Sequence, residues 1–140
     1  MHRETLEIQT PGRGFSEITD AINRVVRKSG ADDGLCHLFI LHTSASMIVT
    51  ENADPDVLRD LDTFMGGLVR DGDARFAHTA EGIDDMSAHV RSILTGTSLT
   101  IPVTRGELLL GTWQGVFIWE HRTRPHARRV VVTVADAGHG

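Results

Sequence analysis

Three histidines lie at the ends of expected structural elements, and their side chains suit metal binding or proton transfer. They are His42, His78 and His89, separated by 36 and 11 residues. Imidazole is the commonest protein ligand of transition metals, and three histidines with a carboxylate satisfy zinc while leaving room for water. This spacing matches no compact zinc signature, so the alternative for each histidine is a hydrogen-bonded polar residue at the end of an element.

A carboxylate accompanies the last of these histidines at a helical spacing. If residues 85–94 form a helix, Asp85 and His89 are four residues apart and share a face, within reach of a hydrogen bond or a common ligand. The simpler interpretation is a capping Asp85 followed by a solvated histidine, because such pairs also occur by chance.

Polar residues at two expected turns are candidate substrate contacts. Thr43 and Ser44 follow the first histidine, and Glu51 and Asn52 follow the next apolar stretch. Glu51 and Asn52 are as compatible with a site as with a polar turn, whereas helix capping already accounts for Asp54 beside them.

The segment 111–121 alternates like a strand and carries both tryptophans of the chain. Alternation places Gln114 on one face and Trp113 and Trp119 on the other. Because the chain has few aromatic residues, their clustering predicts core packing or a subunit contact for that face. Core packing is the favoured role of both tryptophans.

Four arginines surround Pro125 between the last two expected strands. Guanidinium groups bind phosphate through paired hydrogen bonds, so this group could hold a phosphate or pyrophosphate. A solvated basic turn explains it equally well. The four are Arg122, Arg124, Arg128 and Arg129.

Composition favours one globular domain over residues 1–140. A chain of 140 residues buries about two-thirds of its unfolded surface around a single core. The net charge of −5 and the lack of a broad basic block argue against nucleic acid as a partner. No stretch approaches the roughly 18 apolar residues of a membrane span. The single cysteine, Cys36, lies in an apolar run, which predicts a buried thiol and a cytoplasmic protein.

Hydrophobic periodicity predicts three helices, at residues 16–29, from Pro55 to before Asp71, and at 85–94. Ser16 and Asp54 are the expected N-caps of the first two. Residues 71–84 show no period and are expected to form a loop, and long loops in compact domains are often functional. Strands are predicted at residues 5–9, 35–41, 46–50, 98–103, 111–121 and 128–135.

Together these segments resemble the YjbQ-like family, small bacterial and archaeal domains linked to secondary thiamine-phosphate synthase activity. The resemblance spans most of the chain, and its most specific parts are the His-Thr-Ser and Gly-Thr-Trp-Gln elements. The matching residues are His42-Thr43-Ser44-Ala45-Ser46, Glu51-Asn52-Ala53-Asp54-Pro55-Asp56-Val57, His78, Asp85-Met86-Ser87-Ala88-His89, Ser98 to Pro102 and Gly111-Thr112-Trp113-Gln114-Gly115.

The resemblance implies an α+β fold with a β-sheet core, here flanked by about three helices, and a homotrimer. It also implies a polar pocket, a candidate metal-binding site, that gathers His42, His78 and His89. Relatives often carry Asn where this chain has Asp85, and a carboxylate there is the stronger metal ligand or base.

The leading hypothesis is a transferase that joins hydroxymethylpyrimidine diphosphate to thiazole phosphate and releases pyrophosphate. The departing charge needs Mg²⁺, Zn²⁺ or arginine. The expected metal ligands are His42, His78 and His89, and the expected catalytic residues are His42, Asp85 and Glu51. The expected substrate contacts are Thr43, Ser44, Asn52, Trp113, Gln114 and Arg129. The alternatives are a metal-dependent hydrolase of a small phosphorylated or acyl substrate and a non-catalytic trimeric metal- or ligand-binding module.

Overall fold

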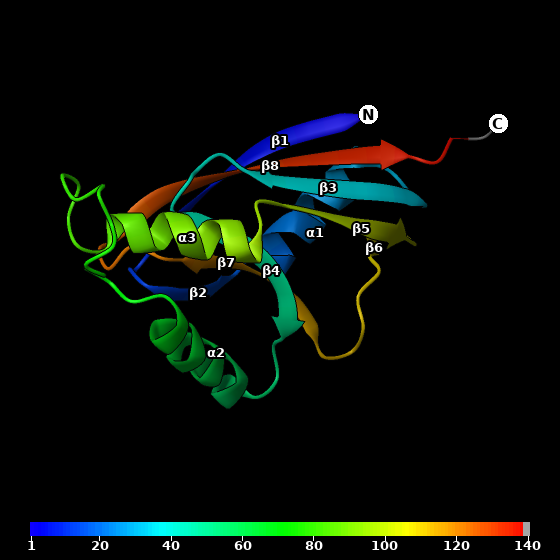
Figure 1. Cartoon of the computed structure of the whole chain (residues 1–140). Coiled ribbons are helices and arrows are strands. Elements are labelled where there is room, and N and C mark those ends of the chain that lie inside the picture. Colours follow the sequence, from blue (N-terminus) through cyan, green and yellow to red (C-terminus); the bar gives the residue numbers. More distant parts are fainter. Residues whose placement is uncertain (139–140) are drawn as a thin grey trace.

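Alternating apolar and polar residues build two antiparallel sheets in the computed structural model, which describes residues 1–138 (Figure 1). Two-residue alternation turns every second side chain of a strand to the same face. In chain order the elements are β1 (His2–Thr10), β2 (Gly14–Glu17), α1 (Thr19–Ser29), β3 (Gly34–Ile40), β4 (Ala45–Glu51), α2 (Pro55–Leu68), α3 (Asp85–Thr95), β5 (Ser98–Thr104), β6 (Glu107–Leu108), β7 (Gln114–Glu120) and β8 (His126–Asp136).

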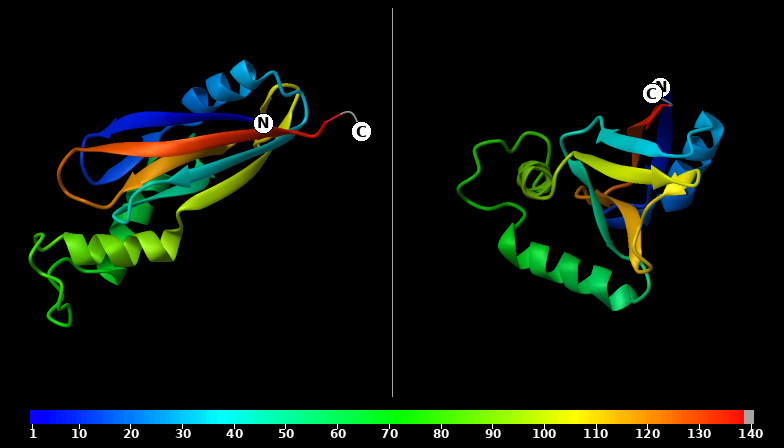
Figure 2. Two further views of the ribbon diagram at one scale, coloured as in Figure 1. Left: turned by 90° about the horizontal axis from the view of Figure 1, so that it is seen from above. Right: turned by 90° about the vertical axis from the view of Figure 1, so that its right-hand side faces the viewer.

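The large sheet has the strand order β1-β8-β3-β5-β6, and the small sheet has the order β2-β7-β4. The first and last strands pair along their length, from Thr10 opposite His126 to His2 opposite Val134. The sheets curl around a common interior, with α1 on one side and with α2 and α3 on the other (Figure 2). The expected α+β class with three helices is confirmed.

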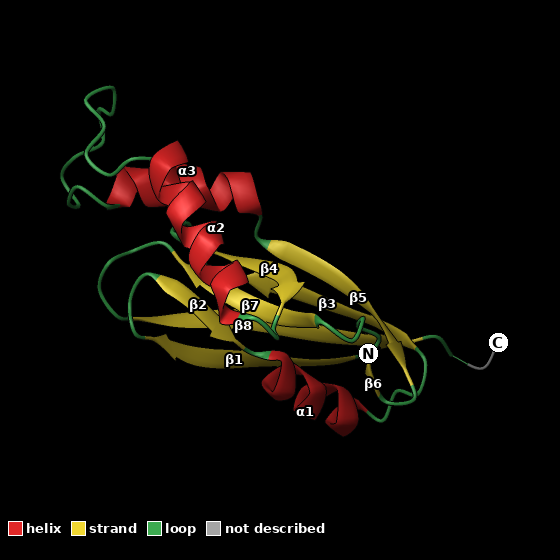
Figure 3. Cartoon of the chain, turned by 90° about the horizontal axis from the view of Figure 1, so that it is seen from below, coloured by secondary structure: helices red, strands yellow, loops and turns green. Residues whose placement is uncertain are grey.

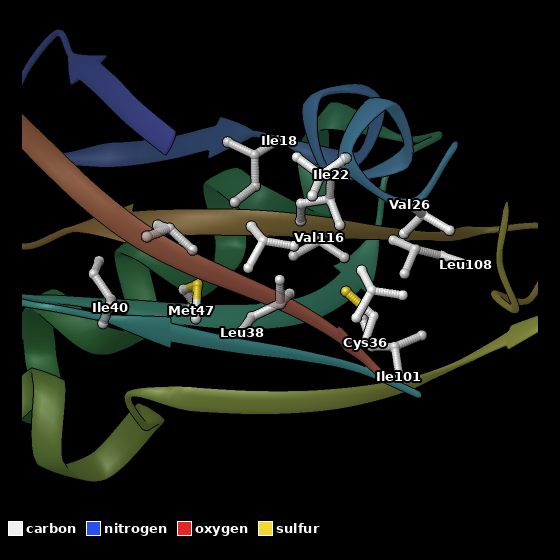
Figure 4. Packing of buried hydrophobic residues seen from close by; sticks show 14 of the residues in the cluster. Ile18, Ile22, Val26, Cys36, Leu38, Ile40, Met47, Ile101, Leu108 and Val116 are labelled. Carbon is white, nitrogen blue, oxygen red and sulfur yellow. The ribbon is translucent and has the colours of Figure 1, made fainter. Parts of the chain in front are cut away.

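The main core lies between the inner face of the large sheet, the small sheet and α1 (Figure 4). Strand β3 contributes Cys36, Leu38 and Ile40, and α1 contributes Ile22 and Val26, all almost fully buried. Burial raises the pKa of the Cys36 thiol to about 11, so this cysteine is a small apolar core residue, as its sequence context predicts.

A second, smaller cluster covers the other face of the small sheet. Trp119 of β7 packs there with Met65 of α2 and with Val69, the residue that follows this helix. Strand β7 is therefore covered on both faces, and α2 and α3 lie on the side of the small sheet that faces away from α1 (Figure 3). None of the three helices in the described part of the chain is long and apolar enough to span a membrane.

Two sequence expectations are wrong. The first helix begins at Thr19 and not at residue 16. Ser16 belongs to strand β2, where it pairs with Ile118 of β7. Trp113 is 63% exposed and is no part of the core. It lies in a turn before β7, where the Gln114 backbone N–H donates to the Gly111 carbonyl at 3.0 Å.

Other local expectations are confirmed. Asp54 caps α2 by accepting a hydrogen bond from the Asp56 backbone N–H at 2.9 Å, and Pro55 occupies the first turn. Helix α3 begins at Asp85, with Asp84 as its N-cap residue, and residues 71–84 form a loop without helix or strand.

A buried ion pair joins the two sheets. Glu120, the last residue of β7, accepts a hydrogen bond from Nε of Arg128 in β8 at 2.7 Å. Thr10 of β1 donates to the same carboxylate at 2.6 Å, and Arg128 also donates to Oγ of Ser44 at 2.9 Å. Burial raises the pKa of Glu120, but the bonds from Arg128 and Thr10 outweigh burial and hold it below its usual range. The pair is therefore ionised, and both carboxylate oxygens of Glu120 accept hydrogen bonds.

Replacing Glu120 with glutamine should destabilise the protein by about 3–5 kcal/mol, because the Arg128 charge stays buried without its partner. Urea unfolding at pH 7 measures this loss. The control is Asp56→Asn, which removes an exposed ion pair to Arg59 and should cost less than about 1 kcal/mol. Equal, small losses in both variants would contradict the assigned role of Glu120.

Candidate metal centre at the start of helix α3

Two histidines and one aspartate meet where the 71–84 loop runs into α3. Oδ2 of Asp85 accepts a hydrogen bond from Nε2 of His78 at 2.7 Å and lies 3.3 Å from Nε2 of His89. Asp85 and His89 share a helix face because they are four residues apart, as predicted, and the loop supplies His78. The two imidazole rings meet edge to face, with centroids 5.6 Å apart.

The aspartate is the buried member of this cluster. Its side chain is 9% exposed, against 45% for His78 and 32% for His89. Burial raises the pKa of Asp85, but the hydrogen bond from His78 and the charges of Arg122 and His89 outweigh burial and lower it. Asp85 is therefore a fixed carboxylate, and the histidines face solvent.

Arg122 binds the oxygen of Asp85 that does not contact the histidines. Its Nη1 donates to Oδ1 of Asp85 at 2.8 Å, its Nε donates to Oδ2 of Asp84 at 3.1 Å, and its Nη2 donates to the Glu81 carbonyl at 2.9 Å. The Arg122 backbone N–H in turn donates to Oε2 of Glu120 at 3.0 Å. One arginine thus connects the loop, the start of α3 and the buried ion pair.

The neighbouring aspartate, Asp84, has a structural role. Asp84 also accepts hydrogen bonds from the backbone N–H of Thr123 at 2.8 Å and from its hydroxyl at 3.1 Å. Burial raises the pKa of Asp84, but the bonds from Thr123 and Arg122 outweigh it and hold the pKa far below its usual range. Asp84 therefore fixes the segment after β7 against the start of α3.

Buried polar contacts anchor the other end of α3 on the small sheet. Thr95 donates to Oγ of Ser46 at 2.6 Å, and Nε2 of His121 lies 2.8 Å from the same oxygen. Burial, together with the charge of Arg91, lowers the pKa of His121 to about 3, so this histidine is neutral. Helix α3 is thus held at both ends, and the face that bears Asp85 and His89 has a fixed position.

The donor set fits a divalent transition metal. Nitrogen atoms of His78 and His89 and a carboxylate oxygen of Asp85 all lie within 4.8 Å of one another. Two imidazoles and one carboxylate form a common zinc site that keeps a position open for water or substrate. The hydrogen bond from Arg122 to Oδ1 of Asp85 would orient this ligand, as the hydrogen-bond partners of ligands do in metal sites.

His42 does not join this cluster within one chain. Its Nε2 accepts a hydrogen bond from the Arg129 backbone N–H at 2.8 Å. Burial and the charges of Arg128 and Arg129 lower its pKa, so the ring is neutral and carries its proton on Nδ1. Nε2 of His42 is therefore already occupied, and the side chains that converge within one chain are His78, Asp85 and His89.

The residues that follow His42 have separate positions. Oγ of Ser44 is buried and accepts from Arg128, whereas Thr43 is exposed. Among the arginines considered for phosphate binding, Arg122 and Arg128 are engaged by carboxylates, and the side chains of Arg124 and Arg129 are exposed.

Four predicted site residues lie at the far end of the small sheet. Glu51 is paired with Gln114, whereas Ala45, at the other end of β4, is paired with Glu120. A strand rises about 3.3 Å per residue, so the two ends of β4 are about 20 Å apart. Within one chain, Glu51, Asn52, Trp113 and Gln114 therefore lie away from the metal centre.

Local contacts occupy three of these four residues. Oε2 of Glu51 accepts from the Asp54 backbone N–H at 3.0 Å, and Nδ2 of Asn52 donates to Glu17 at 3.2 Å. Oε1 of Gln114 accepts from the Gly111 backbone N–H at 2.7 Å.

The sequence did not point to Asp84 or Glu120, nor to the hydrogen bonds that Arg122 donates to Asp84 and Asp85. Two adjacent acids, Asp84 and Asp85, precede and begin the expected helix and were the signal available in the sequence. The Glu120–Arg128 pair gave no local signal, because it depends on the contact between two sheets.

Comparisons with known proteins agree with the fold. The family model described as "UPF0047 protein YjbQ-like" matches residues 4–137. A UPF0047 protein of Synechocystis is 54% identical over 96% of this chain and 91% of its own length. The UPF0047 protein YjbQ of Escherichia coli O157:H7 is 40% identical over 95% of this chain and 96% of its own length. The crystal structure of a conserved hypothetical protein from Thermus thermophilus has a TM-score of 0.86 at 35% identity, covering 94% of this chain and 99% of that one.

Replacing Arg122 with methionine should loosen the 71–84 loop, because the Glu81 carbonyl, Asp84 and Asp85 all lose a donor. Limited trypsin digestion should cut after Arg75 several-fold faster than in the unaltered protein. The control is Arg124→Met, which removes an exposed arginine two residues away. Equal cleavage rates in both variants would show that Arg122 does not hold the loop.

Proposed function

This chain belongs to the UPF0047 family of YjbQ-like proteins, and on that premise we propose that it binds one divalent metal ion through His78, Asp85 and His89 for catalysis on a small phosphorylated substrate. The observation that carries the proposal is the convergence of these three side chains within 4.8 Å. The nitrogen and oxygen donors favour zinc over magnesium, which prefers oxygen ligands and keeps several waters.

The exposure of the cluster supports a catalytic site over a closed structural one. Both histidines are partly exposed, so solvent or substrate can reach the position between them. A structural zinc site would be expected to have four protein ligands. Asp85 offers only one oxygen to an ion, because Arg122 binds the other, and Arg122 also partly balances its charge.

The reaction we propose is the one that the family resemblance implies. The methylene carbon of hydroxymethylpyrimidine diphosphate forms a bond to the thiazole phosphate nitrogen, its bond to the diphosphate oxygen breaks, and pyrophosphate leaves with the electron pair. A bound metal ion would supply positive charge against this leaving group. In this proposal Arg122 holds the ligand Asp85 in place. Exposed arginines at the start of β8, including Arg129, would bind phosphate groups of the substrates.

A metal-dependent hydrolase is the second candidate, and the same exposure favours it. A site open to solvent admits the water that hydrolysis needs, whereas a transferase must keep water from competing with its acceptor. Consumption of a second substrate separates the two activities.

Zinc titration of chelator-treated protein tests the metal site. Isothermal calorimetry should show one zinc per chain, with affinity reduced at least about tenfold in His78→Gln and His89→Gln, since each loses one of three ligands. The control is His2→Gln, because His2 lies 2.8 Å from Glu4 in a histidine–carboxylate pair of its own. Equal affinity in all four proteins would place zinc elsewhere.

Activity is measured on the same proteins. Zinc-loaded protein free of host enzyme should form thiamine phosphate and pyrophosphate in equal amounts from the two precursors, and His89→Gln should not. Release of phosphate or pyrophosphate without the thiazole acceptor would support the hydrolase. Zinc binding with neither activity would contradict both enzymatic candidates and favour a binding module.

We also propose that three copies assemble, a number taken from the family resemblance. The outer face of the large sheet supports an interface, because β3 and the residue after it expose Leu35, Phe39 and Leu41 there. We also propose a cytoplasmic location, because the single cysteine is buried and free, as is usual in a reducing compartment.

Light scattering should give a mass of about 46 kDa, three times the 15.3 kDa of the chain. Phe39→Glu should lower the mass toward that of one chain, because it buries a charge in the proposed interface. The control is Phe64→Glu on α2, where the phenylalanine is 70% exposed, against 42% for Phe39. A wild-type mass near 15.3 kDa would contradict the trimer.

A further inference from the structure

A small cavity lies under the 71–84 loop, directly beside the proposed metal centre. Its volume is about 160 Å³, and its apolar walls are Phe76, Ile83 and Met86. His78 lines the same cavity and also belongs to the metal cluster, so the two sites share a side chain. Met86 directly follows the metal ligand Asp85 in α3.

One backbone hydrogen bond and one side-chain hydrogen bond hold the loop that forms this cavity. The Gly72 backbone N–H donates to the Ile83 carbonyl at 2.9 Å and closes the two ends of the loop. Arg122 holds the loop at the Glu81 carbonyl. Gly72 and Gly82 have φ angles of 65° and 105°, which side chains rarely adopt, so the turns on either side of the cavity depend on glycine.

The chemistry of the walls selects an uncharged group. The carboxylate of Asp73 lies at the cavity, and its hydrogen bonds to Arg75 lower its pKa to about 2, so it is ionised. Arg75 already pairs with this carboxylate, and the residues that line the cavity include no lysine or arginine to attract an anion. A neutral apolar group would contact Phe76, Ile83 and Met86. Ile83 is 75% exposed, so a bound apolar group would cover part of its surface.

The volume sets the size of this group. A closed apolar cavity of about 150 Å³ accommodates one benzene molecule. The cavity under this loop is partly open to solvent and has a comparable volume, so one six-membered ring fits within it.

We propose that this cavity binds a single uncharged ring of the substrate, with an oxyanion substituent of the same substrate directed past His78 toward the metal centre. Phe76, Ile83 and Met86 then determine specificity for the ring. This inference rests on the proposed metal site and adds a second, separately testable contact to it.

Paired phosphonates test the proposal on zinc-loaded full-length protein. The probe 4-fluorophenylphosphonate carries a ring and an oxyanion, and methylphosphonate carries the oxyanion alone. Titration calorimetry should show the ring-bearing probe binding at least about tenfold more tightly, because burial of an apolar ring is favourable. Equal affinities would overturn the ring pocket and leave the metal site standing.

Two matched variants locate the effect. Ile83→Ser removes part of the cavity wall and should bring the two affinities within about threefold of each other, since the apolar contact is lost. Leu68→Ser changes an exposed apolar side chain of similar size on α2 and should keep the full difference. A preserved difference in Ile83→Ser would place the ring elsewhere and overturn the assignment.

A neutral probe separates this inference from the metal proposal. If the protein binds no zinc, 4-fluorobenzyl alcohol is titrated instead and followed by ¹⁹F line broadening and by the Met86 methyl resonance. Broadening that is lost in Ile83→Ser but kept in Leu68→Ser would support the pocket by itself. No broadening in the unaltered protein would overturn it.

Discussion

The buried ion pair between Glu120 and Arg128 is the interaction on which the rest of the structure depends. It joins the end of β7 to β8, so it fixes the small sheet against the large one. The same carboxylate accepts the backbone N–H of Arg122, whose side chain then reaches Asp84, Asp85 and the Glu81 carbonyl. The positions of His78, Asp85 and His89 at the proposed metal centre therefore depend on a contact in the protein interior, because the short segment 120–122 takes part in both.

The sequence predicted those elements whose signals are local. Asp54 and Pro55 mark the start of α2, and the spacing of Asp85 and His89 places two site residues on one face of α3. Prediction failed where a distant partner decides the outcome. Ser16 resembles a helix cap but pairs with Ile118, far away in the sequence, and Trp113 alternates in phase with β7 but precedes it in an exposed turn.

The same distinction explains the candidate site. The sequence shows that His42 follows a strand and that His78 lies in a loop. It does not show the direction in which either side chain points. His78 turns toward Asp85, whereas His42 turns toward the backbone of β8. The Glu51 and Gln114 group lies a full strand length from the cluster. Any role of those residues beside this metal centre would require a second subunit.

Anomalous X-ray diffraction at the zinc edge, from a crystal soaked in zinc, tests whether His78, Asp85 and His89 hold one metal ion, as we propose. We expect one peak per chain within about 2.0–2.2 Å of Nε2 of both histidines and of one Asp85 oxygen. A peak at His42 without contact to His78 and His89, or no peak at this cluster in zinc-saturated crystals, would contradict it.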